Sequence, residues 1–572
     1  MAAYWAALYF YIFAPHKTCV NIFGANLAII AMGDFMYKRV VIFFSMLMVA
    51  MGIAVYNTYK ISKGEMLCDA AARQSSYKLK VATMRGKIYD CQKRPLVGVE
   101  DETYISVTPE VETLGVLPQI LSEDERNLAF EEMKAGKPFV LKLSDEKQVI
   151  ARGIKTFKVP QRYAKEQIAP HIIGYLNGDM QGVCGIEKAF NDYLNSARGS
   201  IFVKYKVDAL NRRIPGEGAT IENTMYKCSR GIVLTIDQKI QRMAEAAAQK
   251  YIKKGAVIVT EVPNCEIRAC VSMPTFSPTN VADVLSDEDS PLLNRALLPY
   301  NIGSVFKLVT AAAILQENKN PNAVYDCVGS CEVDGHKFHC FNNKGHGPID
   351  LEKAVAFSCN AYFIEKALEI GGEKILNLAK DLGFSKEIEL APGITSKAGV
   401  LPTLKDLEQS RALANFSFGQ GKLLVTPLQV AALTNAIAAE GLYCEPRLVE
   451  GLVNEGLKYV QKAAKPKPTR VLTAECAKHL VEYMKASVEY GTSKQGKPEV
   501  GIAAAKTGTA QTGIKSGDHA VVQAWYAGIF PAEKPKYSIV VFAEDAKGGG
   551  ESCGPAFKKI AEEIFGNILK DN

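Results

Sequence analysis

The chain has 572 residues, of which 48% are hydrophobic and 23% are charged, enough for two to four domains with substantial cores. Its formal net charge of +7 is small for this length, which argues against a nucleic-acid-binding function. The fourteen cysteines are scattered, so their spacing imposes no disulfide framework on the whole chain.

Residues 37–59 are predicted to anchor the chain in a membrane. Residues 40–56 contain no charged side chain, and with the residues that follow they reach roughly the length that crosses a bilayer. Lys38 and Arg39 directly precede this run, so the positive-inside rule places its start in the cytoplasm and the following chain outside. No clear small-residue cleavage site follows, which favours an uncleaved anchor.

Residues 1–36 form an N-terminal extension with two interpretations. In the first, Met36 is the true start of the protein. In the second, the extension contains an additional membrane helix that enters from outside, and Lys38 and Arg39 form a cytoplasmic turn. The anchor is therefore predicted to be single-pass in the first case and two-pass in the second, and both place the large C-terminal region outside.

Residues 60–226 are predicted to form a non-catalytic pedestal domain. Their pattern is mixed and polar, with short strands expected at residues 87–89 and 139–143. Ser122 and Glu125 form a capping box that predicts the start of a helix. Because no chemically reactive group of residues gathers here, we expect a structural or partner-binding role.

Residues 227–572 are predicted to form a single α+β domain. Strands are expected at residues 231–236, 255–262, 266–272, 501–505, 521–530 and 537–543, and helices at 238–252 and 555–569. Strands at both ends of this region, with helices between them, indicate one sheet assembled from distant parts of the sequence. We expect that sheet to be largely antiparallel.

The most informative stretch of this domain is the apolar helix predicted after Gly303. Its polar side chains Ser304, Lys307 and Thr310 are spaced by three, so they lie along one stripe of a helix that is otherwise too apolar for a surface. A lysine buried in such a helix has a depressed pKa and can act as a neutral base. Lys307 can therefore accept the proton of the Ser304 hydroxyl one turn earlier, which makes Ser304 a candidate nucleophile.

Two further short motifs follow in the same domain. Ser358-Cys359-Asn360 lies between two apolar helical stretches, where small polar side chains can point into a cleft. Lys506-Thr507-Gly508-Thr509 follows the small-residue strand predicted at residues 501–505. Taken alone, the first motif could be an ordinary surface turn, and the second could be a solvated strand end. The two motifs therefore support a function only in combination.

Ser-x-x-Lys, Ser-x-Asn and Lys-Thr-Gly in this order are typical of β-lactamases and penicillin-binding proteins. The chain resembles the membrane-anchored class B penicillin-binding proteins from about residue 80 to its C-terminus. It departs from the family pattern at Ile302, where a proline is usual, and at Cys91 to Lys93. Additional segments similar to that family begin at Arg85, His171, Gly185, Val207, Asn294, Gly345, Gly419 and Trp525.

The resemblance implies a penicillin-binding/β-lactamase-like fold with helices on both faces of the sheet, in a protein of the bacterial cell membrane. It also implies a serine-type peptidoglycan D,D-transpeptidase that cross-links stem peptides through an acyl-enzyme. In such an enzyme Ser304 is the nucleophile and Lys307 its base, and Ser358 relays a proton to the leaving amine. Asn360 holds the substrate amide and orients Lys307, while Lys506 supplies positive potential.

Substrate binding is assigned by the same resemblance to the strand motif. Thr507 and Thr509 would bind the terminal carboxylate beside Gly508, and the backbone N–H groups of Ser304 and Thr509 would form the oxyanion hole. The implied ligands are peptidoglycan stem peptides and β-lactam antibiotics. The implied protein partners are a membrane glycosyltransferase or proteins of the divisome or elongasome, with elongation, division and sporulation roles all left open.

Other functions fit parts of this pattern less well. A D,D-carboxypeptidase or β-lactamase would use the same acylation with water as acceptor, but the large pedestal and fixed anchor disfavour both. A β-lactam sensor would need several membrane segments and a cytoplasmic effector. A scaffold without turnover would not need all three motifs intact.

A group of cysteines and histidines in the same domain could hold zinc, although the implied reaction needs no metal or cofactor. The alternatives are a local disulfide such as Cys327 to Cys340, or free thiols. The candidate ligands are Cys327, Cys331, His336, His339 and Cys340.

Overall fold

A computed structural model describes residues 25–63, 75–144, 149–317, 320–516 and 519–570. The chain divides into two compact units. The first comprises Met1–Leu79, Met133–Pro138 and Lys204–Thr220, and the second Lys80–Glu132, Phe139–Val203 and Ile221–Asn572. The domain boundaries drawn from the sequence, at residues 37, 60 and 227, stay predictions.

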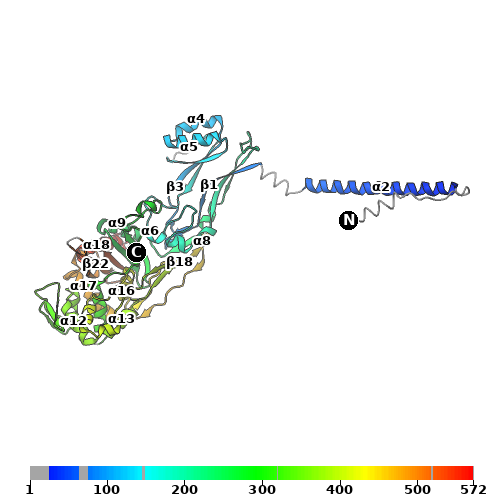
Figure 1. The fold of residues 1–572 in the computed structure, drawn as a ribbon. Helices are drawn as coiled ribbons and strands as arrows, with labels where there is room; N and C mark the ends of the chain where they lie inside the picture. The colour runs from blue at the N-terminus through cyan, green and yellow to red at the C-terminus, as the bar shows by residue number, and fades with distance from the viewer. Residues whose placement is uncertain (1–24, 64–74, 145–148, 318–319, 517–518, 571–572) are drawn as a thin grey trace. The chain divides into compact units, whose positions relative to one another are not determined.

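The N-terminal helix α2 (Ala25–Ser62) is unbroken (Figure 1). Its segment Met36–Ser62 contains an 18-residue window with a mean hydropathy of 2.1 that is not buried inside the protein, so by length and composition it is a candidate membrane span. The helix passes through Lys38 and Arg39 without a turn, and the two-pass alternative is therefore not supported. Residues 1–24 of the predicted extension lie outside the described residues.

The early part of the second unit contains a small antiparallel sheet in the order β4-β3-β5. The strand predicted at residues 139–143 is confirmed as β4. The capping box is also confirmed, since the backbone N–H of Ser122 donates to Glu125 Oε2 at 2.8 Å. The elements are β3 (Asp101–Val107), α4 (Val111–Ile120), α5 (Glu123–Lys134), β4 (Phe139–Leu143) and β5 (Ile154–Pro160).

A buried charge network lies near the beginning of this unit. The Arg85 guanidinium lies 3.4 Å from the Glu187 carboxylate, and both side chains are fully buried. Arg162 contacts the other oxygen of Glu187 at 2.6 Å. Other elements between residues 76 and 223 include β1 (Ser76–Met84), α6 (Pro170–Ile173), α7 (Gly185–Ala189), α8 (Asn191–Ser196), β6 (Gly199–Lys206) and β7 (Thr220–Asn223).

A four-stranded sheet in the order β19-β18-β8-β2 joins segments that are distant in sequence. β2 (Lys87–Tyr89) pairs in parallel with β8 (Gly231–Leu234), which pairs antiparallel with β18 (Val449–Val453). β19 (Tyr459–Lys462) completes it. The strand predicted at residues 231–236 therefore exists, but its assignment to the catalytic sheet is wrong, because its hydrogen-bonding partners are β2 and β18.

The central sheet of the second unit has five strands in the order β10-β9-β23-β22-β21. Every neighbouring pair in it is antiparallel, as the sequence predicted for a sheet built from both ends of the region. β21 is an edge strand of this sheet. The strands are β9 (Gly255–Glu261), β10 (Glu266–Met273), β21 (Ala504–Ser516), β22 (His519–Phe530) and β23 (Tyr537–Ala543).

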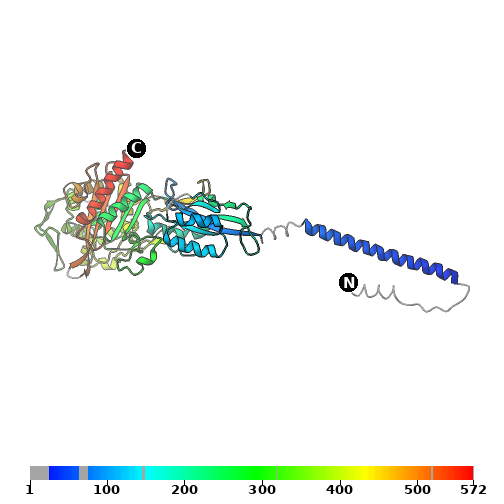
Figure 2. The ribbon, with the colours of Figure 1, turned by 90° about the horizontal axis from the view of Figure 1, so that it is seen from above.

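Helices cover both faces of the central sheet because its buried side chains alternate between two apolar cores. Val257 and Val259 pack with residues of α9 (Gln238–Tyr251) and α18 (Gly554–Ile564), which lie side by side in Figure 2. Ile258 faces the other core. That core contains residues of α10 (Lys307–Gln316), α16 (Pro427–Ala438) and α17 (Ala474–Glu489).

The buried helix predicted after Gly303 is confirmed. A 3-10 turn, η4 (Gly303–Phe306), leads directly into α10, which is buried from Lys307 to Ile314. The remaining helices of this layer are α11 (Leu351–Ala356), α12 (Asn360–Ile370), α13 (Gly372–Asp381), α14 (Leu404–Leu407) and α15 (Ser410–Ser417). The small hairpin strands include β11 (Tyr325–Cys327), β12 (Ser330–Val333), β13 (His336–His339) and β14 (Gly347–Ile349).

Candidate active site

Ser304 lies in the turn η4, and the residue before it fixes that turn against the edge strand β21. Gly303 has a φ of +58°, a conformation that residues with a Cβ rarely adopt. A Cβ at Gly303 would also lie only 2.7 Å from the carbonyl oxygen of Thr509. Glycine is thus required twice over, and the requirement places the turn carrying Ser304 directly beside the Lys-Thr-Gly-Thr strand.

The chain just before Ser304 is hydrogen-bonded to the neighbouring strand β22. The indole N–H of Trp525 donates to the carbonyl oxygen of Asn301 at 2.7 Å, and the Asn301 N–H donates to Gln523 Oε1 at 2.7 Å. Trp525 is fully buried. These two bonds attach the turn that carries Ser304 to β22, the strand next to the edge strand β21.

Lys307 is fully buried, and its amine contacts the Ser358-Cys359-Asn360 motif. Its Nζ donates to Asn360 Oδ1 and to the Ser358 carbonyl oxygen, both at 2.6 Å, and lies 3.1 Å from Ser358 Oγ. Burial lowers the pKa of Lys307 from its usual value to about 8. A useful fraction of this amine is therefore neutral near physiological pH.

Lys506 approaches the same hydroxyl from β21. Its Nζ lies 3.0 Å from Ser358 Oγ and 3.0 Å from the Thr507 carbonyl oxygen, and the side chain is fully buried. Burial lowers the pKa of Lys506 well below its usual value, and the nearby Lys307 amine lowers it further. The Ser358 hydroxyl is thus held between two buried amines.

Ser358 itself has a strained backbone. It lies in the loop between α11 and α12 with a φ of 57°, a left-handed conformation that is uncommon for residues other than glycine and frequent at functional sites. The next residue, Cys359, caps α12, because its sulfur accepts a hydrogen bond from the backbone N–H of Tyr362 at 3.5 Å. The loop therefore presents Ser358 and Asn360 to Lys307 in a fixed geometry.

The predicted substrate-binding residues lie inside β21 rather than after a strand, because β21 begins at Ala504 and continues through Lys506 to Ser516. Thr507 Oγ1 donates to Thr492 Oγ1 at 2.8 Å, and Thr509 Oγ1 accepts from the Gly549 N–H at 3.3 Å. A Cβ at Gly508 would lie 2.7 Å from the Ile302 carbonyl oxygen. The structure thus brings this strand motif to the turn that carries Ser304 and to the Ser-x-Asn loop.

The cysteine and histidine group is composed differently from the sequence prediction. Ligand atoms of four side chains, those of Cys327, Cys340, His346 and Cys359, lie within 4.8 Å of one another. Although the structure describes Cys331, His336 and His339, these three predicted ligands are not members of the group. Sequence reasoning missed His346 and Cys359, which it had noted only as parts of two other motifs.

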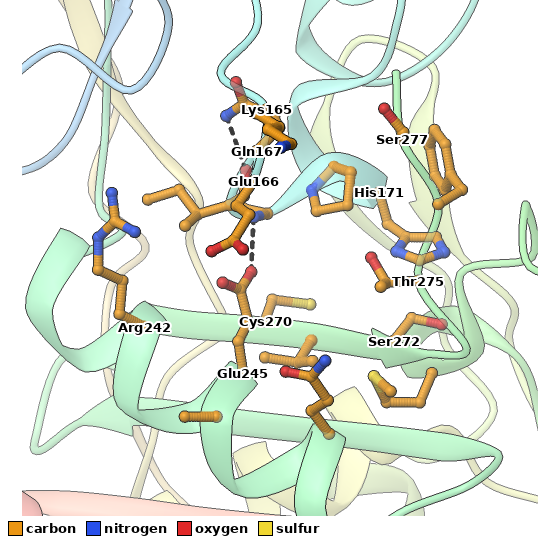
Figure 3. A pocket seen from close by; sticks show the side chains of 18 of the residues that line it. Lys165, Glu166, Gln167, His171, Arg242, Glu245, Cys270, Ser272, Thr275 and Ser277 are labelled. Atoms are coloured by element: carbon orange, nitrogen blue, oxygen red, sulfur yellow. Dashed lines mark hydrogen bonds between the residues drawn. The ribbon is translucent and has the colours of Figure 1, made fainter. Parts of the chain in front are cut away.

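A separate cavity of about 520 Å³ lies between residues 165–171, α9 and β10 (Figure 3). The Glu245 carboxylate points into it and accepts a hydrogen bond from the Ala169 N–H at 2.7 Å. Burial raises the pKa of Glu245 and lowers that of His171, the latter to about 4. The described residues that line this cavity are different from all eight predicted site residues, and they contain no paired nucleophile and base.

Residues 255–568 match the family model described as the penicillin binding protein transpeptidase domain. The match covers more than half of the chain, so the protein belongs to the penicillin-binding protein transpeptidase family and is an acyltransferase of the serine type. The predicted family and fold class are confirmed.

Curated relatives and solved structures agree with this assignment. The chain is 29% identical to Stage V sporulation protein D of Bacillus subtilis over 89% of its own length and 81% of the relative. It is 27% identical to the Peptidoglycan D,D-transpeptidase PbpA of Mycolicibacterium smegmatis, over 73% of this chain and 85% of the relative.

The fold is shared with solved structures of low sequence identity. A structure described as a peptidoglycan synthase complex that coordinates polymerization and crosslinking matches with a TM-score of 0.67 at 24% identity, covering 93% of this chain and 98% of the other. Penicillin binding protein 3 of Mycobacterium tuberculosis, complexed with aztreonam, matches with a TM-score of 0.62 at 20% identity, covering 86% and 97%.

Proposed function

We propose that the protein is a peptidoglycan D,D-transpeptidase that cross-links stem peptides through an acyl-enzyme on Ser304. The observation that carries the proposal is the buried Lys307 amine, one turn after Ser304 and hydrogen-bonded to Ser358 and Asn360. Relatives named as D,D-transpeptidases support the substrate class.

In the first half-reaction Ser304 Oγ attacks the carbonyl carbon between the two terminal D-alanines of a stem peptide. The neutral Lys307 Nζ takes the hydroxyl proton as the new C–O bond forms. The backbone N–H groups of Ser304 and Thr509 donate to the resulting oxyanion. The C–N bond then breaks, and the leaving D-alanine amine receives a proton through the Ser358 hydroxyl, which lies 3.1 Å from Lys307 Nζ.

In the second half-reaction an amino group from a neighbouring strand attacks the ester carbonyl of acyl-Ser304. The new C–N bond forms, the C–O bond to Ser304 breaks, and the amine proton returns to Ser304 Oγ through Lys307. The product is a cross-link between two stem peptides. Water in place of the amine would give a carboxypeptidase or a β-lactamase.

The strand motif binds the carboxylate of the donor peptide. Thr507 and Thr509 offer hydroxyl groups beside Gly508, whose missing side chain lets the strand lie against the nucleophile turn. Lys506 supplies the positive charge. Burial lowers the pKa of Lys506, and an anionic group that pairs with it raises that pKa again and favours the charged form.

The experiment is covalent labelling of the full chain with a fluorescent penicillin, followed by mass spectrometry of its peptides. We expect one adduct, on the peptide that carries Ser304, and its complete loss in Ser304→Ala. A matched control is Ser75→Ala, which changes the serine of another Ser-x-x-Lys sequence and should label normally. An adduct on a different serine would contradict the proposal.

The lifetime of that adduct separates the transpeptidase from its alternatives. A transpeptidase excludes water from the acyl-enzyme, so we expect the penicilloyl adduct on Ser304 to persist for many hours. Hydrolysis within seconds would instead indicate a β-lactamase.

We further propose that the protein is a bitopic membrane enzyme whose catalytic region faces outward. The apolar helix α2 and the positive charges of Lys38 and Arg39 support this orientation. A membrane glycosyltransferase is the proposed partner, because the match to a complex that coordinates polymerization and crosslinking supports joint assembly.

A further inference from the structure

Four potential metal-binding side chains converge behind the Ser358-Cys359-Asn360 loop. Cys327 ends β11, Cys340 follows β13, His346 precedes β14, and Cys359 caps α12. Three of them therefore come from the small hairpin region between α10 and α11, and the fourth lies inside a catalytic motif.

The distances within this group match a tetrahedral metal site. A zinc ion with Zn–S bonds of about 2.3 Å and a Zn–N bond of about 2.0 to 2.1 Å separates its sulfurs by about 3.8 Å and sulfur from nitrogen by about 3.6 Å. The three sulfur pairs lie 3.7, 3.7 and 3.4 Å apart, and Cys327 Sγ lies 3.4 Å from His346 Nδ1. These four distances are close to those that one ion would impose, and all four ligand atoms lie within 4.8 Å of one another.

The surroundings of the group favour a bound ion. The exposed fractions of Cys327, Cys340 and Cys359 are 1%, 3% and 0%, so their sulfurs are shielded from solvent. The ring of His346 is stacked on that of Phe357 with the two planes 1° apart, which holds its Nδ1 toward Cys327. Orientation of a histidine ligand by its neighbours is a common feature of zinc sites.

We propose that Cys327, Cys340, His346 and Cys359 form a tetrahedral site for Zn²⁺ that fixes the loop carrying Ser358 and Asn360. Three thiolates and one imidazole form a donor set that is typical of structural zinc, which needs no redox chemistry and no open coordination position. On binding, each of the three thiols releases its proton to solvent.

The site is connected to the catalytic residues through short covalent and hydrogen-bonded paths. Cys359 lies between Ser358 and Asn360 in the chain. The Asn360 side-chain amide donates to the His339 carbonyl oxygen at 2.8 Å, and the Ala361 N–H donates to Cys340 Sγ at 3.4 Å. Zinc would therefore fix both Asn360, which contacts Lys307, and the strained Ser358 backbone.

The alternative to metal binding by these thiols is a disulfide bond, which is favoured on the outer side of a membrane. It would bring one sulfur pair to about 2.05 Å and would leave the third cysteine and the histidine without a role. Three sulfurs at nearly equal distances, with an imidazole nitrogen beside them, favour a shared ion over one selected pair.

The first test is the metal content of the full-length protein, purified in detergent with a phosphine reductant. We expect about one zinc per chain by elemental analysis. Replacement of zinc by Co²⁺ should give visible absorption bands of tetrahedral cobalt and intense thiolate-to-cobalt bands in the near ultraviolet. This spectrum reports the ligand set of the unmutated protein, so it does not depend on the folding of any variant.

Matched substitutions test the identity of the ligands. Cys327→Ser and His346→Gln should weaken metal binding by more than about 100-fold, the upper range seen when only an outer partner of a ligand is lost. Cys331→Ser and His336→Gln change the same residue types in the same hairpin region and should retain one zinc. Loss of zinc in these controls as well would overturn the assigned ligand set.

A second measurement tests whether the ion positions the catalytic loop. Removal of zinc by a chelator should lower the rate of acylation by fluorescent penicillin at least about 10-fold, and added Zn²⁺ should restore it. An unchanged rate would overturn the positioning role even if zinc is bound. Because metal content is measured separately, failure of the D,D-transpeptidase assignment would leave the metal result standing.

Two outcomes would overturn the site itself. One is metal-free wild-type protein with intact thiols that gives no thiolate-to-cobalt band. The other is a disulfide among Cys327, Cys340 and Cys359, found by mass spectrometry in protein prepared from membranes without reductant and lacking zinc.

Discussion

The Ser358 hydroxyl is in contact with two buried amines, Lys307 at 3.1 Å and Lys506 at 3.0 Å. Two ammonium groups so close together in a buried site repel each other strongly, so the pair titrates as a coupled system. Burial lowers the pKa of both amines, and the nearby Lys307 charge lowers that of Lys506 further. In the proposed mechanism, the state that is active in acylation is the one in which Lys307 is neutral.

The rate of acylation should follow the neutral fraction of Lys307. Its pKa is lowered by burial to about 8, so protonation removes the base as pH falls below that value. We expect the rate to fall about tenfold per pH unit below pH 8 and to level off above it. Stopped-flow measurement with a fluorescent penicillin between pH 6 and 9.5 tests this expectation.

A substitution of Lys307 distinguishes its role as the base from general effects of pH on the protein. Lys307→Arg keeps a positive charge but cannot lose its proton near neutral pH, so acylation should be about 10²- to 10⁴-fold slower and should no longer rise toward pH 8. A wild-type rate that is constant from pH 6 to 8 would contradict the assignment of Lys307 as the base.

Single residues could be predicted from the sequence where a charged side chain lies in an apolar stretch. They were harder to predict where strand pairing decides which side chains meet. Lys307 was identified because an ammonium in an apolar helix needs a reason. The members of the proposed metal site were only partly identified, because pairing of β12 with β13 sets Cys331 opposite Phe338, whereas Cys340 contacts Cys359 at the start of α12. Sequence spacing alone contains no information on that pairing.

At the scale of elements, the site depends on the close approach of the turn η4 to the strand β21. Gly303→Ala should be strongly unfavourable, since the new methyl group would lie 2.7 Å from the Thr509 carbonyl oxygen and φ is positive. We expect about 1 to 2 kcal/mol of lost stability from the left-handed backbone, about 1 to 3 kcal/mol more from overpacking, and slower acylation.

The control for this variant is Gly335→Ala, in the turn between β12 and β13. Gly335 also has a positive φ, of 75°, but a Cβ there would meet no atom within 4 Å. It should therefore show only the backbone cost of about 1 to 2 kcal/mol and normal acylation. Thermal unfolding of both proteins gives the comparison, and equal losses would refute the close-approach argument.

Whole elements were predicted well where apolar runs are long. The strand expected at residues 537–543 matches β23, and the helix expected at 238–252 matches α9 within one residue. The strand expected at residues 501–505 was ended too early, because the polar sequence from Lys506 to Thr509 has the composition of a loop but belongs to β21, which runs from Ala504 to Ser516. Its strand conformation is set by pairing with β22, which is a long-range interaction.

At the scale of the whole molecule, residues near the start of the second unit pair and pack with residues much later in the chain. β2 pairs with β8, and Arg85, two residues before β2, is buried against Glu187. Glu187→Gln would leave the Arg85 guanidinium buried beside a neutral group. We expect a loss of about 3 to 5 kcal/mol in unfolding free energy, measured by denaturant unfolding in detergent.

An exposed ion pair gives the matched control for this variant. Glu551 lies 3.1 Å from Lys547, and the exposed fractions of the two side chains are 58% and 81%. Glu551→Gln should cost less than about 1 kcal/mol, because solvent screens the interaction. Similar losses in the two variants would contradict a structural role for the buried network.

The sheet that contains β2 also shows why the whole-molecule organisation could be predicted only in part. Residues 60–226 were expected to form a separate domain, because their sequence pattern is mixed and polar. Pairing of residues 87–89 with residues 231–233 crosses that predicted boundary. A three-residue strand has too little sequence pattern to reveal a partner more than a hundred positions away.

The two amines around Ser358 have a consequence for ligand recognition in the proposed mechanism. Burial and the nearby Lys307 amine lower the pKa of Lys506, so a ligand that arrives with a carboxylate would raise that pKa and favour uptake of a proton from solvent by the amine. Ligand affinity and proton uptake would then be linked, and the heat of binding would vary with the ionisation enthalpy of the buffer. Anionic ligands would bind more weakly as the medium becomes alkaline. The pH that gives the largest neutral fraction of Lys307 would therefore differ from the pH at which the donor peptide binds most tightly.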